Sequence, residues 1–226
     1  MVLEKLLQLP NPAGNKGCLL HFSSHLDQYG IDQTDAAELL TIATDQELYY
    51  GTHAEFFAMH YALYALGALQ SVDACPAILN QLNQLNVDED EWVDSYVFVF
   101  EMMGEQAIPY LIQGCKTLNL ESIFVLTESL GKLSGQFPAY REQVLVAFDE
   151  LLSRIEFCPA QPHALFSGET ALLMGWLDMK AVERIDVIRA LDQQNRFDKS
   201  YTGYLEEIEY VLGLRTDKLN QSNLYD

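Results

Sequence analysis

Apolar side chains along this chain recur every three or four residues, the spacing that places them on one face of an α-helix. Between residues 94 and 135 the pattern predicts a helix, a tight turn at Gly104, a second helix that starts near Pro109, and a third helix after a short link. The apolar positions of the first two helices are Val97, Phe100, Met103, Ile108, Leu111 and Ile112.

The same spacing predicts helices along the rest of the chain. They span residues 2–8, 18–29, 53–69, 121–133, 140–155, 165–177, 179–191 and 204–214. Two more helices should begin near Asp32 or Thr34 and at Asp73, and the first of them should turn Ala37, Leu40 and Ile42 inward. Alternating β-branched residues are scarce. The chain is therefore expected to be all-α.

A short segment recurs where the second helix of a pair begins. Residues 74–79 (ACPAIL) match residues 107–112 (AIPYLI) at an offset of 33, and residues 181–186 (AVERID) form a weaker third copy without the proline. A period of about 30 to 45 residues made of helix pairs is typical of α-solenoids, in which neighbouring pairs cover each other's apolar faces.

These segments resemble HEAT-type repeats, whose second helix often starts with alanine and proline after a short turn. Residues 51–214 also resemble a bacterial family of HEAT-like proteins classed as a domain of unknown function, most clearly at residues 53–69 and 196–209. The resemblance implies an α-α superhelix and no established reaction. The expected organisation is one domain over residues 1–226, with a helical lead-in (1–50), HEAT-like pairs (51–194), and a cap helix and tail (195–226).

The charge of the chain narrows the choice of partner. Thirteen Lys and Arg residues stand against 33 Asp and Glu residues, and residues 17–115 contain no Lys or Arg but 15 carboxylates. A surface of one sign repels polyanions, which argues against nucleic acid and anionic membranes as partners. It would attract a basic segment of another protein, although acidic surfaces also simply keep proteins soluble.

Seven carboxylates between residues 88 and 105 are expected to bind such a partner. They are Asp88, Glu89, Asp90, Glu91, Asp94, Glu101 and Glu105. The run from Asp88 to Glu91 lacks the glycine and the late glutamate of a calcium-binding loop, and it favours a solvated helix start. Glu101 and Glu105 are four residues apart, but Gly104 interrupts the helix between them, so an acid–base pair is not expected.

Other candidate chemistry is sparse. His21 and His25 have the i, i+4 spacing of a two-point metal site, although no third ligand is evident and a partly exposed helix flank is the favoured interpretation. His60 lies on an apolar helix and is expected to be a hydrogen-bonded core residue. No catalytic motif, phosphate loop or CxxC pair is present, so we predict no catalytic residue, metal or cofactor.

The four cysteines, Cys18, Cys75, Cys115 and Cys158, are widely spaced, which predicts reduced thiols in a cytoplasmic protein. Two hypotheses of function follow. The first is a noncatalytic scaffold that binds a basic segment of another protein. The second, suggested only by bilin attachment in some HEAT-like proteins, is a small-molecule or tetrapyrrole-handling protein, lyase-like, with an apolar groove near His60 or Cys115. No feature predicts an oligomeric state.

Overall fold

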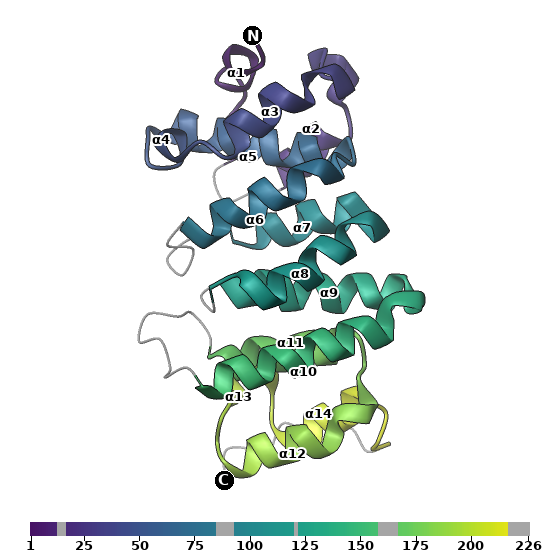
Figure 1. The fold of residues 1–226 in the computed structure, drawn as a ribbon. Helices are drawn as coiled ribbons and strands as arrows, with labels where there is room; N and C mark the ends of the chain where they lie inside the picture. The colour runs from purple at the N-terminus through teal and green to yellow at the C-terminus, as the bar shows by residue number, and fades with distance from the viewer. Residues whose placement is uncertain (13–16, 85–92, 120–121, 158–166, 217–226) are drawn as a thin grey trace. The chain divides into compact units, whose positions relative to one another are not determined.

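The computed structural model describes residues 1–12, 17–84, 93–119, 122–157 and 167–216. Over these ranges it contains α-helices, short 3₁₀ helices and turns but no strand, which confirms the all-α prediction (Figure 1). The chain divides into two compact units, Met1–Leu111 and Ile112–Asp226, which we call the N-terminal and C-terminal units. In the part of the chain that is described, no helix is both long enough and apolar enough to cross a bilayer.

The N-terminal unit is organised around one buried helix, α5 (His53–Ala68). Thr52 caps α5 through the backbone N–H of Glu55, whose carboxylate accepts from the N–H of Thr52 in return. Helices α1, α2, α3, α4 and α7 all pack against α5, which explains why it has no polar face. The elements of this unit are α1 (Val2–Leu6), α2 (Gly17–Ser23), η1 (Leu26–Tyr29), η2 (Gln33–Asp35), α3 (Ala36–Ala43), α4 (Gln46–Tyr49), α5, η3 (Val72–Ala74), α6 (Cys75–Gln84), α7 (Asp94–Met103), η5 (Gly104–Ala107) and the start of α8 (Ile108–Thr117).

The C-terminal unit is built on the close packing of two helices, α9 (Ile123–Gln136) and α11 (Gly168–Asp178). Gly131 on α9 lies against Gly175 on α11: a Cβ built on Gly131 would stand 2.7 Å from the carbonyl oxygen of Gly175. Only glycine permits this approach of the two backbones. The other elements are η7 (Pro138–Tyr140), α10 (Arg141–Phe157), η8 (Val182–Arg184), α12 (Ile185–Gln193), α13 (Lys199–Thr202) and α14 (Leu205–Val211).

One local arrangement recurs along the chain: a 3₁₀ turn leads directly into an α-helix. It precedes α3, α6, α8, α10 and α12, whose first residues are 39, 33, 33 and 44 positions apart. The two sequence copies at 74–79 and 107–112 occupy the same place in this arrangement, because Ala74 and Ala107 each end the 3₁₀ turn. The third copy is shifted by three residues, since Ala181 precedes its 3₁₀ turn.

Three predicted helices differ from the structure. The helix expected over residues 179–191 begins only at Ile185, because Lys180 adopts a left-handed conformation (φ 50°) and η8 comes before the helix. The helix expected over residues 18–29 stops at Ser23 and is followed by η1, because the hydroxyls of Ser23 and Ser24 both donate to the carbonyl of Leu20 and Gly30 closes the segment at φ 59°. Helix α3 begins only after η2, so its buried face is Leu39, Ile42 and Ala43. Ile42 was predicted correctly, whereas Ala37 is exposed and Leu40 only half-buried.

Candidate interaction surface

The acidic residues of the N-terminal unit follow its helix starts. Twelve carboxylates of this unit lie in the described ranges, and none is buried. Eleven of the twelve are helix N-caps or stand in the first turn of an α- or 3₁₀ helix, where a negative charge complements the helix dipole. These eleven are Glu4, Asp27, Asp32, Asp35, Glu38, Asp45, Glu47, Glu55, Asp73, Asp94 and Glu105.

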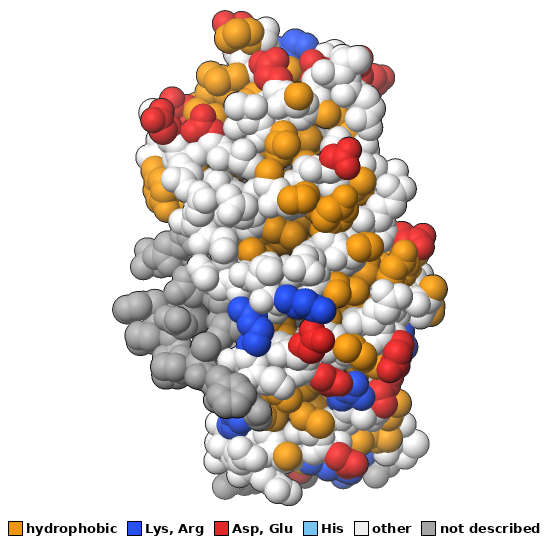
Figure 2. Space-filling model, viewed as in Figure 1, with side chains coloured by type: hydrophobic (Ala, Val, Ile, Leu, Met, Phe, Trp, Pro, Cys, Tyr) orange, Lys and Arg blue, Asp and Glu red, His pale blue; other side chains and the backbone are white. Residues whose placement is uncertain are grey.

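Cations are distributed very differently between the two units. Lys5 is the sole Lys or Arg in the described part of the N-terminal unit, and its ammonium donates to the carbonyl of Gly30. Of the ten described Lys and Arg residues in the C-terminal unit, nine bond to a carboxylate or to backbone carbonyls of that unit. In Figure 2 the Lys and Arg side chains lie over the C-terminal unit, apart from one near the N-terminus. The N-terminal unit therefore presents largely uncompensated negative charge.

The seven carboxylates predicted to bind a partner fall into two groups. Asp88, Glu89, Asp90 and Glu91 lie outside the described residues. Asp94 and Glu101 are half-buried on α7, and Glu105 is exposed in η5. Gly104 has φ 71° and ends α7, so Glu101 and Glu105 do not share a helix. Their predicted role in binding stays a prediction.

A half-open groove of about 330 Å³ lies in the N-terminal unit, and sequence analysis did not anticipate it. Its apolar wall is formed by Ala36, Ala37 and Leu40 of α3 together with Leu66 and Val72. Gln33, Gln70, Ser71 and Asp73 supply polar groups to the lining. No signal in the sequence reveals the groove, because Ala37 and Leu40 have the spacing expected of a buried helix face.

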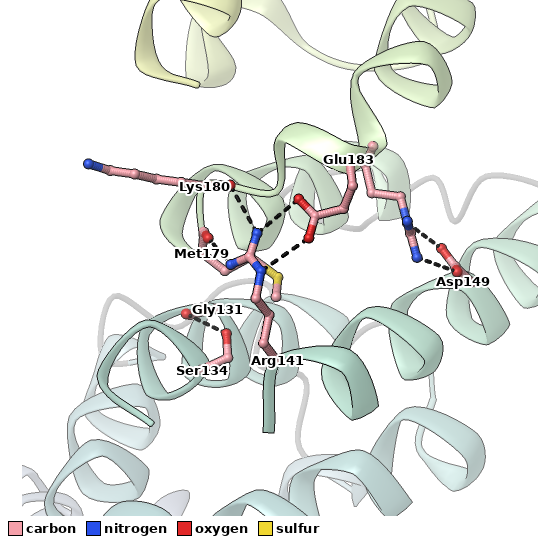
Figure 3. Close-up of polar contacts among 8 residues, drawn as sticks. Gly131, Ser134, Arg141, Asp149, Met179, Lys180 and Glu183 are labelled. Atoms are coloured by element: carbon pink, nitrogen blue, oxygen red, sulfur yellow. Dashed lines mark hydrogen bonds and ion pairs between the residues drawn. The ribbon is translucent and has the colours of Figure 1, made fainter. Parts of the chain in front are cut away.

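An arginine cluster holds three elements of the C-terminal unit together (Figure 3). Arg141, the first residue of α10, donates to the carbonyls of Met179 and Lys180 beyond the end of α11 and forms a two-point pair with Glu183, with N–O distances of 3.1 and 3.0 Å. Arg184 forms a second such pair with Asp149, at 2.9 and 2.7 Å. Through these contacts the Arg141 guanidinium clamps the start of α10 to the loop that follows α11.

The histidines form no metal site among the residues that are described, where no group of three or more potential His, Cys, Asp and Glu ligands occurs. His25 lies beyond the end of α2, and its Nδ1 is 2.8 Å from the carbonyl oxygen of His21. His60 is fully buried, and its Nδ1 is 3.0 Å from the carbonyl oxygen of Phe56, which confirms the predicted core histidine. Tyr61, Tyr64 and Phe100 are buried as well and pack in the core.

Two of the thiols are buried. Cys75 and Cys115 are fully buried, and Cys18 is half-buried; these three form no disulfide with one another, and Cys158 lies outside the described residues. Burial raises the pKa of the thiols of Cys75 and Cys115 to about 12. Neither is suited to covalent attachment of a pigment, because the thiolate is the reacting form.

These raised pKa values predict a loss of stability at alkaline pH. A thiol whose pKa is higher in the folded state holds its proton more tightly there. Its contribution to the free energy of unfolding is therefore intact below about pH 9 and is lost as pH rises toward 12. Between pH 8 and pH 10, the unfolding free energy should fall by about 1 kcal/mol for each thiol. In urea titrations, the unfolding free energy of Cys75→Ala and of Cys115→Ala should change less between these two pH values than that of the wild type. A change as large as that of the wild type would contradict the prediction.

No family model, curated protein or solved structure matches the chain.

Proposed function

We propose that this chain is a noncatalytic protein-interaction module whose N-terminal unit binds a basic segment of another protein. The observation that carries the proposal is the charge of that unit: its described residues include twelve carboxylates, none of them buried, and one Lys or Arg side chain, that of Lys5. Exposed charge of one sign speeds encounter with an oppositely charged partner and selects against acidic ones. Nine of the ten described Lys and Arg residues of the C-terminal unit bond within that unit, which supports the same division of roles.

We also propose that the recurring helix pairs stack as a HEAT-like α-solenoid in one domain. The spacing of 33 to 44 residues between successive second helices supports this arrangement. The described thiols, which form no disulfide with one another, support a cytoplasmic location. The pigment-handling alternative has no comparable support, because His60 and Cys115 are both fully buried.

Binding of a lysine- and arginine-rich peptide should depend strongly on salt. We expect the affinity to fall by about tenfold or more between about 0.05 M and about 0.5 M NaCl, because exposed charges are screened over about 10 Å at 0.1 M. Isothermal titration calorimetry or fluorescence anisotropy measures the effect. An affinity that does not change with salt, or no binding of the peptide at low salt, would overturn the proposal.

A matched pair of double variants tests which unit is responsible. Glu47→Gln with Glu105→Gln removes two exposed carboxylates from the N-terminal unit, and Glu142→Gln with Glu206→Gln removes two exposed ones from the C-terminal unit. Both change the net charge equally. The first should weaken peptide binding about fivefold and the second less than about twofold. Equal losses would show that net charge alone sets the affinity.

A further inference from the structure

The loop that joins α5 to α6 and the loop that joins α11 to α12 have the same backbone. At an offset of 110 residues, Gln70 and Lys180 both adopt a left-handed conformation that is uncommon for residues other than glycine, with φ 51° and 50°. Ser71 and Ala181 follow with φ −77° in each case and ψ 70° and 69°. Five backbone hydrogen bonds also correspond, donated by residues 69, 70, 71, 72 and 74 in one loop and 179, 180, 181, 182 and 184 in the other.

In the C-terminal unit this loop is filled by an arginine. The guanidinium of Arg141 bonds to the carbonyls of residues 179 and 180 and to the carboxylate of Glu183, as Figure 3 shows. The loop thus offers two carbonyl oxygens and one carboxylate to a single planar cation. This geometry suits arginine, whose donors form a rigid fork, better than the point charge of lysine.

In the N-terminal unit the same three acceptors are present without the arginine. The equivalent groups are the carbonyls of Leu69 and Gln70 and the carboxylate of Asp73. The amide of Gln33 donates to the carbonyl of Leu69, as one Arg141 nitrogen does to Met179, but it is uncharged and makes no bond to Asp73. Asp73 is exposed, and among the described residues no Lys or Arg bonds to it.

A groove lies beside this loop in the N-terminal unit, and Gln33 is part of its lining. The groove of about 330 Å³ is lined by Gln70, Ser71 and Asp73 of this loop and by Ala36, Ala37 and Leu40 of α3. The alanine and leucine side chains offer an apolar wall for the methylene stem of an arginine. Ser71 Oγ is shielded from solvent in the lining and has no hydrogen-bond partner.

We propose that this groove binds an arginine side chain of the partner's basic segment, with the guanidinium on Asp73 and the carbonyl of Gln70, as Arg141 fills the equivalent loop of the C-terminal unit. The inference rests on the proposed function and names the residue type that the groove selects. Charge complementarity supports this occupant, since the described part of the unit carries a single Lys or Arg side chain, that of Lys5, whose ammonium donates to the carbonyl of Gly30.

Three peptides of one lysine-rich sequence test the inference, with arginine, lysine or citrulline at a single central position. Citrulline keeps the shape of arginine but lacks its charge. Binding to the full chain at about 0.05 M NaCl should be about tenfold tighter for the arginine peptide than for the other two. Asp73→Asn should remove that preference, whereas Asp27→Asn, which deletes an exposed carboxylate outside the groove, should preserve it.

A second pair of variants places an arginine in the chain itself. Gln33→Arg should place an intramolecular guanidinium in the loop and weaken binding of the arginine peptide about tenfold. Gln28→Arg makes the same charge change at an exposed site outside the groove and should weaken binding less than about twofold. Circular dichroism of each variant verifies folding.

The outcomes separate this inference from the proposed function. Salt-dependent binding of all three peptides with equal affinity, or equal effects of Asp73→Asn and Asp27→Asn, would overturn the arginine site and leave the basic-segment proposal standing. No binding of any of the peptides would overturn both. Self-association of the wild-type chain that Asp73→Asn abolishes would assign the groove to a second copy instead and would likewise overturn the inference.

Discussion

Replacing Gly131 with alanine should destabilise the C-terminal unit by about 3 kcal/mol, although alanine favours helices more than glycine does. The added methyl group would stand 2.7 Å from the carbonyl oxygen of Gly175 and 3.0 Å from its Cα, both rigid backbone atoms of α11. Helices α9 and α11 would have to move apart, which loosens the tightest packing in the unit. Urea unfolding followed by circular dichroism measures the loss.

Gly135 supplies the matched control on the same helix. A Cβ at Gly135 would lie 3.8 Å from the carbonyl oxygen of Asp178, an ordinary van der Waals distance. Gly135→Ala should therefore be neutral or stabilise the protein by up to about 1 kcal/mol through helix propensity. Equal stability of the two variants would contradict the close approach of α9 to α11.

Replacing Arg141 with lysine should cost about 2 kcal/mol even though the charge is kept. The guanidinium serves two carbonyls and both oxygens of Glu183 at once, which the single nitrogen of lysine cannot do. Urea titration gives the global loss. Amide hydrogen exchange should rise in the segment that joins α11 to α12, because the loop loses its clamp.

Arg189→Lys is the control for this second prediction. Arg189 also pairs with carboxylates, those of Glu209 and Asp186, but its side chain is 44% exposed and it bonds to no loop carbonyl. Its replacement should cost less than about 0.5 kcal/mol. If Arg141→Lys cost as little stability, the Arg141–Glu183 pair in Figure 3 would be a surface ion pair that does not hold the loop in place. The comparison from which arginine binding in the groove was inferred would then lose its support.

Local signals in the sequence were sufficient to place most helices. Thr52 and Glu55 form the capping box that starts α5, and Gly104 ends α7. These signals act within a few residues, so no tertiary information is needed to recognise them. The repeat at residues 74–79 and 107–112 was recognised for the same reason, because a proline marks the start of each helix.

The third copy of the repeat was placed three residues out of register because its loop carries no such signal. This loop and its counterpart between α5 and α6 are defined by the left-handed conformation of Lys180 and Gln70. Neither residue type favours that conformation, so the sequence does not predict it. The groove could not be predicted either, since Ala37 and Leu40 have the spacing of a buried face. Their exposure is decided by the way α3 packs on α5, a long-range contact.

By itself, the sequence determined the all-α class, the main helices and an excess of negative charge, because helix propensity, capping and net charge are properties of neighbouring residues or of composition. Only the tertiary structure decided which carboxylates pair with a Lys or Arg side chain and which of the two equivalent loops binds an arginine. Arg141 is 38 residues from Met179 and 42 from Glu183, so the contact that fills one loop exists only after folding brings α10 against the end of α11. In the equivalent loop of the N-terminal unit no described arginine takes this place: Gln33 donates to the carbonyl of Leu69, and no described Lys or Arg bonds to Asp73.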